Sequence, residues 1–433
     1  MWFRRDLRVD DNAALYHAAK CNDPILAVFV FDKKILEPLA DRDDARVSFI
    51  HDSLVKLQVE LEAQNIQLVT YYETPEVAFT KICGQHKPTR VFANHDYEPS
   101  AIERDKKVQK YLSQTGVEFK TFKDHCIFER NEVTKDDGTP YTVFTAYKNK
   151  WLKSLSPFYY KTYPTTRALG DNLARQKEFS KIENSGVMSL AEIGFSQSKI
   201  HTPERTLRLP LIKNYDKARN DLAESATSRI GVHLRFGTLS IRKCVQIAIR
   251  TNDIWLSELI WRDFFMQILY HFPHVVNTCF RPQFENIVWR NDRKDFQRWC
   301  EGRTGYAVVD AGMRELNSTG HMHNRARMVT ASFLTKHLLI DWRWGERYFA
   351  RKLLDFDLSA NNGNWQWAAG TGCDAAPYFR IFNPDEQQKK FDPNCKYIKR
   401  WVPEFESPEY QNSRIVEHKF ARTRALAAFA RVT

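Results

Sequence analysis

The sequence predicts two architectures in one chain: an α/β N-terminal domain with a doubly wound, Rossmann-like parallel sheet, and an all-helical C-terminal domain. Two observations predict this. In the first third of the 433 residues, short apolar runs alternate with segments of helical spacing, whereas helical spacing prevails beyond residue 215. Strands that alternate with helices favour a parallel sheet covered on both faces, and a chain of this length has room for two or three domains.

Three short runs rich in β-branched and aromatic residues are the predicted strands, at 25–31, 66–72 and 90–94. Between them, residues 45–64 and 101–113 place apolar side chains at helical spacing, with charged outer faces. No glycine-rich dinucleotide or phosphate-binding loop follows a strand. The usual fingerprint for NAD is therefore absent, and this domain is expected to hold something else.

Periodicity is weak in the middle of the chain, where prolines interrupt a stretch rich in Lys, Ser and Thr. This composition is typical of a long connection on the surface. We therefore expect an α/β domain at 1–125, a linker at 126–210 and a helical domain at 211–433. Within the helical domain, the expected helices include 254–270, 306–316 and 325–339.

The composition is that of a soluble globular protein, with 43% hydrophobic and 27% charged residues. A formal net charge of +12 indicates an anionic partner such as nucleic acid, although a merely soluble basic surface is the alternative. The eight cysteines are scattered without a C-x-x-C pair, so neither disulfides nor a metal site is expected. No apolar run is long enough to span a bilayer. We expect a cytoplasmic protein, or a nuclear one if the source has a nucleus.

The stretch at 353–372 combines carboxylates, neighbouring amides and two tryptophans, and an aromatic segment continues it to Pro384. It is too polar for a core and too aromatic for a surface loop. A buried carboxylate or amide without a partner costs roughly 1–3 kcal/mol. A large ligand that is both polar and aromatic would supply the partners, so we interpret this stretch as a cofactor site.

Four further segments form an ordered pattern with this stretch. They are Trp2-Phe-Arg-Arg-Asp-Leu-Arg, Trp255-Leu-Ser-Glu-Leu-Ile-Trp-Arg, Gly302-Arg-Thr-Gly-Tyr and Asn317-Ser-Thr-Gly-His-Met-His-Asn. The pattern resembles the photolyase/cryptochrome family, and most closely its class I cyclobutane pyrimidine dimer (CPD) DNA photolyases. Five motifs that span almost the whole chain are far more specific than one short pattern. The resemblance implies a light-driven flavoprotein with FAD in the helical domain.

The resemblance also implies which residues bind FAD. The loop at 227–231 offers hydroxyls, backbone N–H groups and a guanidinium, which can bind a pyrophosphate. On its own, such a loop is more often only the start of a helix. An Arg–Asp pair would line the flavin ring, with an interhelical ion pair as the structural alternative. The phosphate-side residues are Tyr215, Thr227, Ser228, Arg229, Ile230 and Gly231, and the others are Trp255, Arg327, Asp355, Asp357 and Asn361, the last opposite the flavin N5 atom.

Three tryptophans, Trp365, Trp342 and Trp289, match the chain of indoles that carries an electron to the flavin in this family. Each of them alone is more often a core residue. Trp344 lies close to Trp342 in sequence but matches no motif.

The resemblance places the substrate on two helical segments. Glu258 would hydrogen-bond the damaged base, with a surface ion pair to Arg262 as the alternative for a carboxylate at this spacing. The other residues expected at the lesion are Asn324, Met328, Trp261 and Trp367, and those expected to bind DNA around it are Arg219, Arg262, Arg325, Arg380 and Gln387.

The expected function is light-dependent repair of DNA that contains pyrimidine dimers, by a monomer that needs no metal and no membrane. A cryptochrome photoreceptor, a (6-4) photolyase and a light-independent flavin oxidoreductase are the alternatives. His321 stands where a tryptophan is common in related photolyases. Ser100 and Ala101 replace an Asn–Glu pair that holds a folate in some bacterial relatives. For a second, antenna chromophore, these residues favour a deazaflavin or a flavin over a folate.

Overall fold

The computed structural model describes residues 1–171 and 185–432. Contacts between residues divide the chain into two compact units, each of which combines separate parts of the sequence. Unit 1 contains residues 1–132, 154–206 and 230–250, and unit 2 contains residues 133–153, 207–229 and 251–433.

Five parallel strands lie at the centre of unit 1, which confirms the predicted class of fold. β1 (Trp2–Phe3) pairs with β2 (Leu26–Asp32), and β2 pairs with β3 (Gln67–Glu73). β4 (Arg90–Asn94) pairs with β5 (Glu118–Phe122). β1 also contacts β4, but the hydrogen bonds of the described residues form two sheets, with the strand orders β1-β2-β3 and β4-β5.

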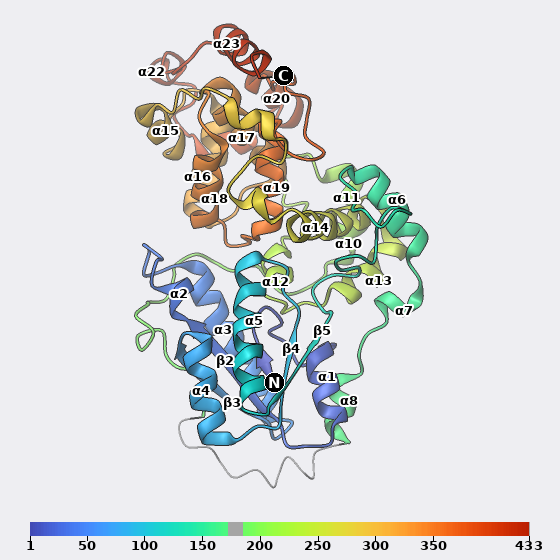
Figure 1. The fold of residues 1–433 in the computed structure, drawn as a ribbon. Coiled ribbons are helices and arrows are strands. Elements are labelled where there is room, and N and C mark those ends of the chain that lie inside the picture. Colours follow the sequence, from blue (N-terminus) through green and yellow to red (C-terminus); the bar gives the residue numbers. More distant parts are fainter. Residues whose placement is uncertain (172–184, 433) are drawn as a thin grey trace. The chain divides into compact units, whose positions relative to one another are not determined.

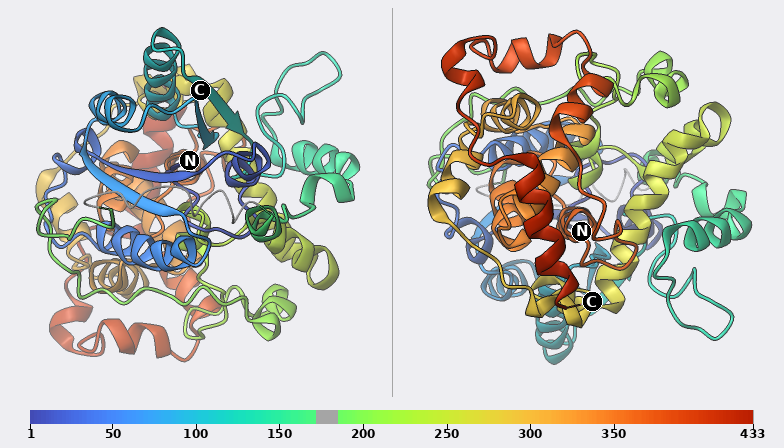
Figure 2. Two further views of the ribbon diagram at one scale, coloured as in Figure 1. Left: turned by 90° about the horizontal axis from the view of Figure 1, so that it is seen from below. Right: turned by 90° about the horizontal axis from the view of Figure 1, so that it is seen from above.

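Helices lie on both sides of these strands (Figures 1 and 2). Side-chain caps and prolines define their ends: Asp44 caps the first of the long helices by accepting from the Arg46 N–H at 2.8 Å, and Pro75 begins the next. The helices described in unit 1 are α1 (Ala13–Lys20), α2 (Lys33–Leu36), α3 (Ala45–Glu62), α4 (Pro75–His86), α5 (Pro99–Gln114), α7 (Pro157–Tyr160), α8 (Thr165–Gly170), α12 (Gly231–Arg235) and α13 (Ile241–Thr251), and the first five of them contact the strands.

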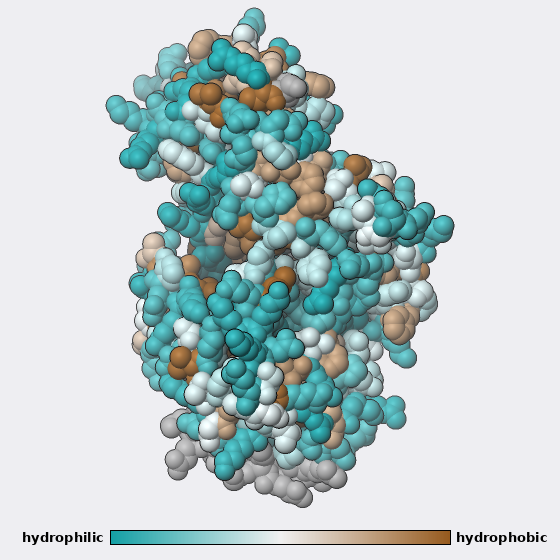
Figure 3. Space-filling view, in the orientation of Figure 1, coloured by the Kyte–Doolittle hydropathy of each residue, from teal (hydrophilic) through white to brown (hydrophobic). Residues whose placement is uncertain are grey.

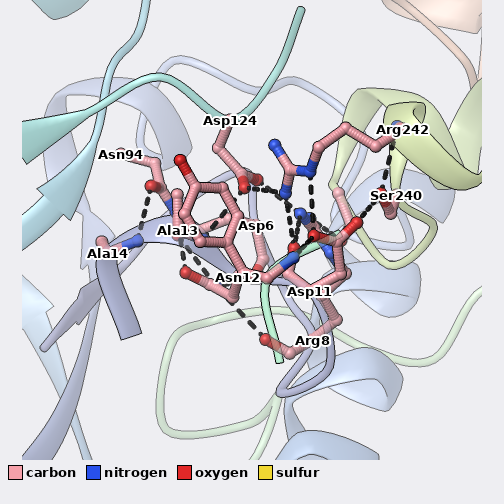
Figure 4. A network of polar contacts seen from close by, with 12 residues as sticks. Asp6, Arg8, Asp11, Asn12, Ala13, Ala14, Asn94, Asp124, Ser240 and Arg242 are labelled. Atoms are coloured by element: carbon pink, nitrogen blue, oxygen red, sulfur yellow. Dashed lines mark hydrogen bonds and ion pairs between the residues drawn. The ribbon is translucent and has the colours of Figure 1, made fainter. Parts of the chain in front are cut away.

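Four buried charged groups join distant segments of unit 1 (Figure 4). Arg242 donates to Asp11 at 2.8 Å and to Asp124 at 2.7 Å, and Arg8 donates to the other Asp124 oxygen at 2.6 Å. Burial by itself would raise the pKa of Asp124, but Arg8 and Arg242 hold this pKa well below its usual value. The network therefore ties the turn after β1 to the segment after β5 and to the start of α13.

Unit 2 is almost wholly helical, as predicted. Its largest apolar core includes Trp299, Trp342 and Phe333. Its helices are α6 (Phe144–Ser154), α10 (Leu209–Lys213), α11 (Tyr215–Ala218), α14 (Asp253–His271), α15 (Arg293–Cys300), α16 (Ala307–Thr319), α17 (Asn324–Ser332), α18 (Trp342–Lys352), α19 (Leu358–Ala369), α20 (Pro384–Phe391), α21 (Lys396–Trp401), α22 (Pro408–Gln411) and α23 (His418–Ala430), with short 3₁₀ helices η1 (Pro273–Val276) and η2 (Pro282–Asn286).

The prediction of one α-helix over 325–339 is wrong in its second half. After α17 the chain forms a π-helix, η3 (Phe333–His337), in which the Leu338 N–H donates to the Phe333 carbonyl at 3.1 Å. The wider turn buries the side chain of Lys336, whose Nζ donates to the Ala369 carbonyl at 2.7 Å. Apolar periodicity does not distinguish a π-turn from an α-turn, because both continue the same helical rod.

Within the described part of residues 126–210, the helices α6, α7 and α8 were not predicted from the sequence. In α6 only Phe144, Tyr147 and Trp151 are buried, about one residue per turn among polar neighbours. So narrow an apolar stripe is a weak signal for a helix.

The described residues show no helix that is long and apolar enough to cross a membrane. Within the same residues, no group of three His, Cys, Asp or Glu side chains is placed to hold a metal ion. Figure 3 shows one face of the molecule, where hydrophilic side chains predominate and apolar ones are scattered.

The Arg242→Met variant is expected to lose about 3–5 kcal/mol of unfolding free energy, because it leaves Asp11 and Asp124 as buried carboxylates with too little positive charge. Urea unfolding followed by circular dichroism measures this loss. The matched control is Lys243→Met, because the neighbouring Lys243 pairs with Asp10 at the surface, where an ion pair contributes about 0–1 kcal/mol. Equal losses in the two variants would contradict a special role for the buried network.

Candidate functional site

One cavity in unit 2 is lined by α17, by the segment before α19 and by α19 itself. Asp357 begins α19 as its N-cap and accepts from the Ala360 N–H at 3.2 Å, which places residues 361, 364, 365 and 368 on one face. The cavity brings together eight residues predicted from sequence: Asn324, Arg327, Met328, Asp355, Asp357, Asn361, Trp365 and Trp367.

Arg327 and Asp355 form an ion pair at the wall of this cavity. Arg327 Nη2 lies 3.1 Å and 3.0 Å from the two Asp355 oxygens, and Arg327 Nε donates to the Met322 carbonyl at 2.7 Å. About a quarter of each side chain is exposed, 26% for Arg327 and 24% for Asp355. The pair is therefore held in place but can still reach a ligand.

Asn361 has both of its amide hydrogens occupied. Its Nδ2 donates to the Glu346 carbonyl at 3.1 Å and to the Glu346 carboxyl at 2.8 Å. The amide oxygen is the group left to meet a ligand, and it can only accept a hydrogen bond. Burial raises the pKa of Glu346, which keeps this carboxyl closer to its neutral form. Sequence analysis missed Glu346, because its contact with Asn361 joins two helices.

The other walls of the cavity are mainly apolar, and sequence analysis assigned none of their residues a role, although those from 353 to 368 lie in the stretch predicted as a cofactor site. They come from Phe349 and Leu353 at the end of α18, from Phe356, and from Ala331, Ala360, Asn364 and Ala368. Asn364 could have been found, because it lies three residues after Asn361 on the same helix.

A flavin ring has a polar imide edge and an apolar benzenoid edge, and this set of residues matches both. Arg327 offers donors, Asp355 offers acceptors, and Phe349 and Leu353 offer apolar surface. The cavity volume is about 100 Å³, below the ~300 Å³ at which ligand pockets usually begin. The residues therefore fit one edge of a flavin, and the rest of the cofactor needs further contacts.

Helix α14 carries the predicted substrate residues Glu258 and Trp261, which lie outside the cavity. Glu258 forms its ion pair with Arg219, which follows α11, so the alternative pair with Arg262 is not the one observed. Burial raises the pKa of Glu258, and the Arg219 charge offsets part of this effect. Trp261 stacks on Phe144, with ring centroids 3.5 Å apart, so Phe144 covers one of its faces.

Two of the predicted DNA-binding arginines lie close enough to influence each other. Arg325 donates to the Asn220 side chain at 2.7 Å, and its guanidinium lies 4.2 Å from the centre of the Phe391 ring. Burial lowers the pKa of Arg325, and the positive charge of Arg219 lowers it further. Gln387 lies one turn before Phe391 in α20, and Arg380 is exposed in the preceding loop.

The predicted phosphate residues do not line the cavity. Tyr215 begins α11, where the Arg219 guanidinium lies 5.2 Å from its ring. Thr227 and Ser228 are partly exposed and Arg229 is exposed, in a loop that ends unit 2, whereas Ile230 and Gly231 begin the last segment of unit 1. Trp255 is buried in the first turn of α14.

The three predicted electron-transfer tryptophans belong to one apolar core, with Trp365 and Trp342 buried and Trp289 at its margin. Trp365 packs edge to face against Trp299, with ring centroids 6.1 Å apart. Trp299 lies 5.8 Å from Phe296, and Phe296 lies 5.1 Å from Trp344. A second series of aromatic rings therefore extends from Trp365 and includes Trp344, for which the sequence offered no partner.

Comparison with known proteins identifies the family. Residues 1–167 match the family model for DNA photolyase, and residues 255–425 match that for the FAD binding domain of DNA photolyase. A deoxyribodipyrimidine photo-lyase from Vibrio cholerae is 38% identical, over 94% of this chain and 90% of its own length. This chain belongs to the DNA photolyase family. Another photo-lyase, from Escherichia coli, is 36% identical over 99% of this photolyase and 98% of its own length.

Solved photolyase structures share the fold. A class III photolyase from Agrobacterium tumefaciens has a TM-score of 0.87 and 32% identity, covering 100% of this chain and 96% of its own. A photolyase from Sulfolobus tokodaii, described with two FAD molecules, has a TM-score of 0.80 and 33% identity, covering 100% and 99%. FAD is confirmed as the cofactor of this photolyase, whereas its assignment to class I is not confirmed, because a class III structure is among the similar ones.

Proposed function

We propose that this photolyase is a deoxyribodipyrimidine photo-lyase, which splits cyclobutane pyrimidine dimers in DNA under light. The observation that carries the proposal is that eight residues predicted from two motifs, at 317–328 and 353–372, line a single cavity. Relatives named for this activity match nearly the whole chain, which supports it further. When bound, reduced FAD supplies the electron that opens the dimer after it absorbs light.

The residues around the cavity would bind and orient the reduced form of the flavin. Arg327 and Asp355 would meet the polar edge of the ring, where the permanent charge of the guanidinium favours an anionic flavin. The Asn361 amide oxygen can accept a hydrogen bond from a protonated N5 but cannot donate one, because Glu346 occupies both amide hydrogens. This arrangement favours the protonated, reduced state that repair requires.

The lesion would lie against the outer part of the same helices. Asn324 and Met328 are adjacent on α17, where Asn324 Nδ2 lies 3.9 Å from the Met328 sulfur. Trp367 is half-buried and offers a flat surface on which a base can stack. Glu258, which Arg219 holds in an ion pair, would form a hydrogen bond with the damaged base.

DNA would be held by its phosphates. Arg219, Arg262, Arg325, Arg380 and Gln387 are the residues that we assign to this role, and the net charge of +12 favours the encounter. Photolyases act on bases taken out of the duplex, and a poorly stacked lesion costs less to extrude. We propose that the enzyme acts as a monomer.

Blue-light repair of an oligothymidine that carries cyclobutane dimers tests this function. The chemically reduced enzyme is expected to restore absorbance near the thymine band in light but not in the dark.

Glu258→Ala should slow repair by about tenfold to a hundredfold, because a hydrogen bond to a developing charge is lost, whereas Glu258→Gln keeps a donor and should lose less. Asp253→Ala, an exposed change in the first turn of the same helix, is the control and should repair normally. No repair by FAD-loaded parent enzyme would refute the proposal and favour a photoreceptor or a (6-4) substrate.

Photoreduction tests the electron path. Trp342→Phe is expected to abolish reduction of oxidised FAD by blue light, because phenylalanine is much harder to oxidise, and to leave repair by chemically reduced enzyme unchanged. Absorbance of oxidised flavin during illumination measures this. Trp401→Phe, at the margin of the same core, is the control. If Trp342→Phe is photoreduced normally but Trp299→Phe is not, the electron path instead runs through the second aromatic series, which leads from Trp365 through Trp299 to Trp344.

We also propose that a second chromophore, a flavin or a deazaflavin, binds in unit 1. A cavity of about 490 Å³ lies at the carboxyl ends of the parallel strands, the usual place for a ligand in such a sheet. Phe29, Phe31 and Phe236 give it apolar walls, and both arginines, such as Arg5 and Arg104, and carboxylates, such as Glu98 and Glu103, line it. Ser100 and Ala101, which replace the folate-binding pair, both line it.

Ser100→Phe is expected to block this second site by filling it, without affecting the FAD of unit 2. Titration of the parent protein with FAD or a deazaflavin should show two chromophores per chain, and the variant should show one. Ser113→Phe is the matched control, because Ser113 is exposed near the end of the same helix and does not line the cavity. A parent protein that saturates at one flavin, but takes up a folate, would contradict the proposal.

A further inference from the structure

Trp289, the outer residue of the proposed electron path, lies where the core of unit 2 meets solvent. Its ring packs edge to face against Phe429 in α23, with ring centroids 5.9 Å apart. Its neighbour Val288 is 76% exposed, and Arg290 on the other side is also exposed. The indole is therefore held by the core but remains partly open to small molecules in solution.

Helix α23, which supplies Phe429, is basic along its whole length. From residue 418 onward the sequence contains no Asp or Glu. The positively charged residues of this segment are Lys419, Arg422, Arg424 and Arg431. All of them are exposed except Arg424, which is half-buried. The helix that packs against Trp289 therefore presents an excess of positive charge to solvent.

Arg424 connects this charge to the surroundings of Trp289. Its guanidinium donates to the His337 carbonyl at 2.5 Å, which fixes its position. Burial lowers the pKa of Arg424, and the positive charge of Arg290 lowers it further, whereas Asp295 acts in the opposite direction. Arg424 and Arg290 therefore lie in the same region. Arg431 follows Arg424 by seven residues, so helical spacing places both on one side of α23.

The carboxylates in this region do not cancel the positive charge. Arg290 lies 3.0 Å from Asp295 and 3.6 Å from Asp292, and these three groups together carry one net negative charge. Glu417 adds another just before α23. The four positive charges of α23 still leave an excess of two, so anions are attracted to this surface and cations are repelled.

Electron transfer along the proposed path leaves Trp289 one electron short, and that electron must come from outside the chain. We propose that the positive surface of α23 recruits a small anionic one-electron donor to Trp289. The inference rests on the proposed function, in particular on the path that ends at Trp289. The donor gives one electron to the Trp289 radical cation, which becomes a neutral indole again. The donor is oxidised by one electron, and no bond forms or breaks.

The test is the rate at which an added donor removes the tryptophan radical after a light flash, followed by transient absorption on the FAD-loaded full chain. Ferrocyanide is the anionic donor and hexaammineruthenium(II) the cationic one. Raising the ionic strength from about 20 mM to about 300 mM should slow the reaction of ferrocyanide by about threefold to tenfold, because salt screens the attraction. The same change should speed the reaction of hexaammineruthenium(II), because salt also screens the repulsion.

Charge reversal on α23 locates the effect. Arg431→Glu should slow ferrocyanide by about threefold and speed hexaammineruthenium(II). The matched control is Lys110→Glu, which changes the net charge equally but is exposed in α5 of unit 1. Trp289→Phe should lose the donor-dependent phase. A ferrocyanide rate that responds neither to salt nor to Arg431→Glu overturns the inference. If Arg431→Glu instead weakens binding of undamaged duplex DNA and leaves the ferrocyanide rate unchanged, the charge of α23 serves DNA.

Fluorescence quenching provides a readout that needs neither electron transfer nor repair. The emission of Trp289 is the part of the tryptophan emission that Trp289→Phe loses. Arg431→Glu should reduce the quenching of this emission by iodide and increase its quenching by caesium, and no change with either ion would overturn the inference.

The outcomes also separate this inference from the proposed function. A flash that yields no tryptophan radical removes Trp289 from the electron path and overturns the inference, whereas repair by chemically reduced enzyme would leave the function standing. An enzyme whose radical responds to ferrocyanide as expected but which repairs nothing would refute the function alone.

Discussion

The structure depends on one constraint above all, that a buried charge must be neutralised where it lies. In unit 1, Asp11 and Asp124 are buried with Arg8 and Arg242, and together they connect the turn after β1 to segments more than a hundred residues away. Asp11 has a φ of 52°, which is unusual for a residue with a side chain. That conformation directs both its carbonyl and its carboxylate at Arg242.

In unit 2, the polar groups around the cavity are only partly buried and partly paired within the protein. This distinguishes the candidate site from the rest of the structure. In the network of unit 1 each charged group finds an opposite charge within the protein. Around the cavity of unit 2, Arg327 and Asp355 are each about a quarter exposed, and the amide oxygen of Asn361 is left as an acceptor. Polar groups held rigidly at a cavity with spare hydrogen-bonding capacity are what a ligand site requires. The difference in exposure and in free hydrogen-bonding capacity therefore distinguishes the buried network of unit 1, which stabilises the fold, from the polar groups of unit 2, which are candidates to bind a ligand.

Much of the fold and of the cavity could be predicted from sequence, because the signals are local. Strands such as 90–94 have a strong β-type composition, and the residues of α17 and α19 that line the cavity follow helical spacing. Glu346 and the Arg219 partner of Glu258 could not be predicted, because each makes its contact between helices. Trp299 was missed for the same reason, since only the fold places it beside Trp365.

Helix α18 shows why such contacts matter more than single residues. A side chain at Gly345 would collide with the Trp365 ring, so only glycine allows α18 to approach α19 this closely. The next residue, Glu346, holds both amide hydrogens of Asn361. Two neighbouring positions on α18 thus fix Trp365, the first proposed electron donor, and Asn361, the residue that we propose lies opposite the flavin N5. Any change that separates these two helices would displace both residues at once, so the proposed electron donor and the proposed hydrogen bond at N5 depend on the same helix contact.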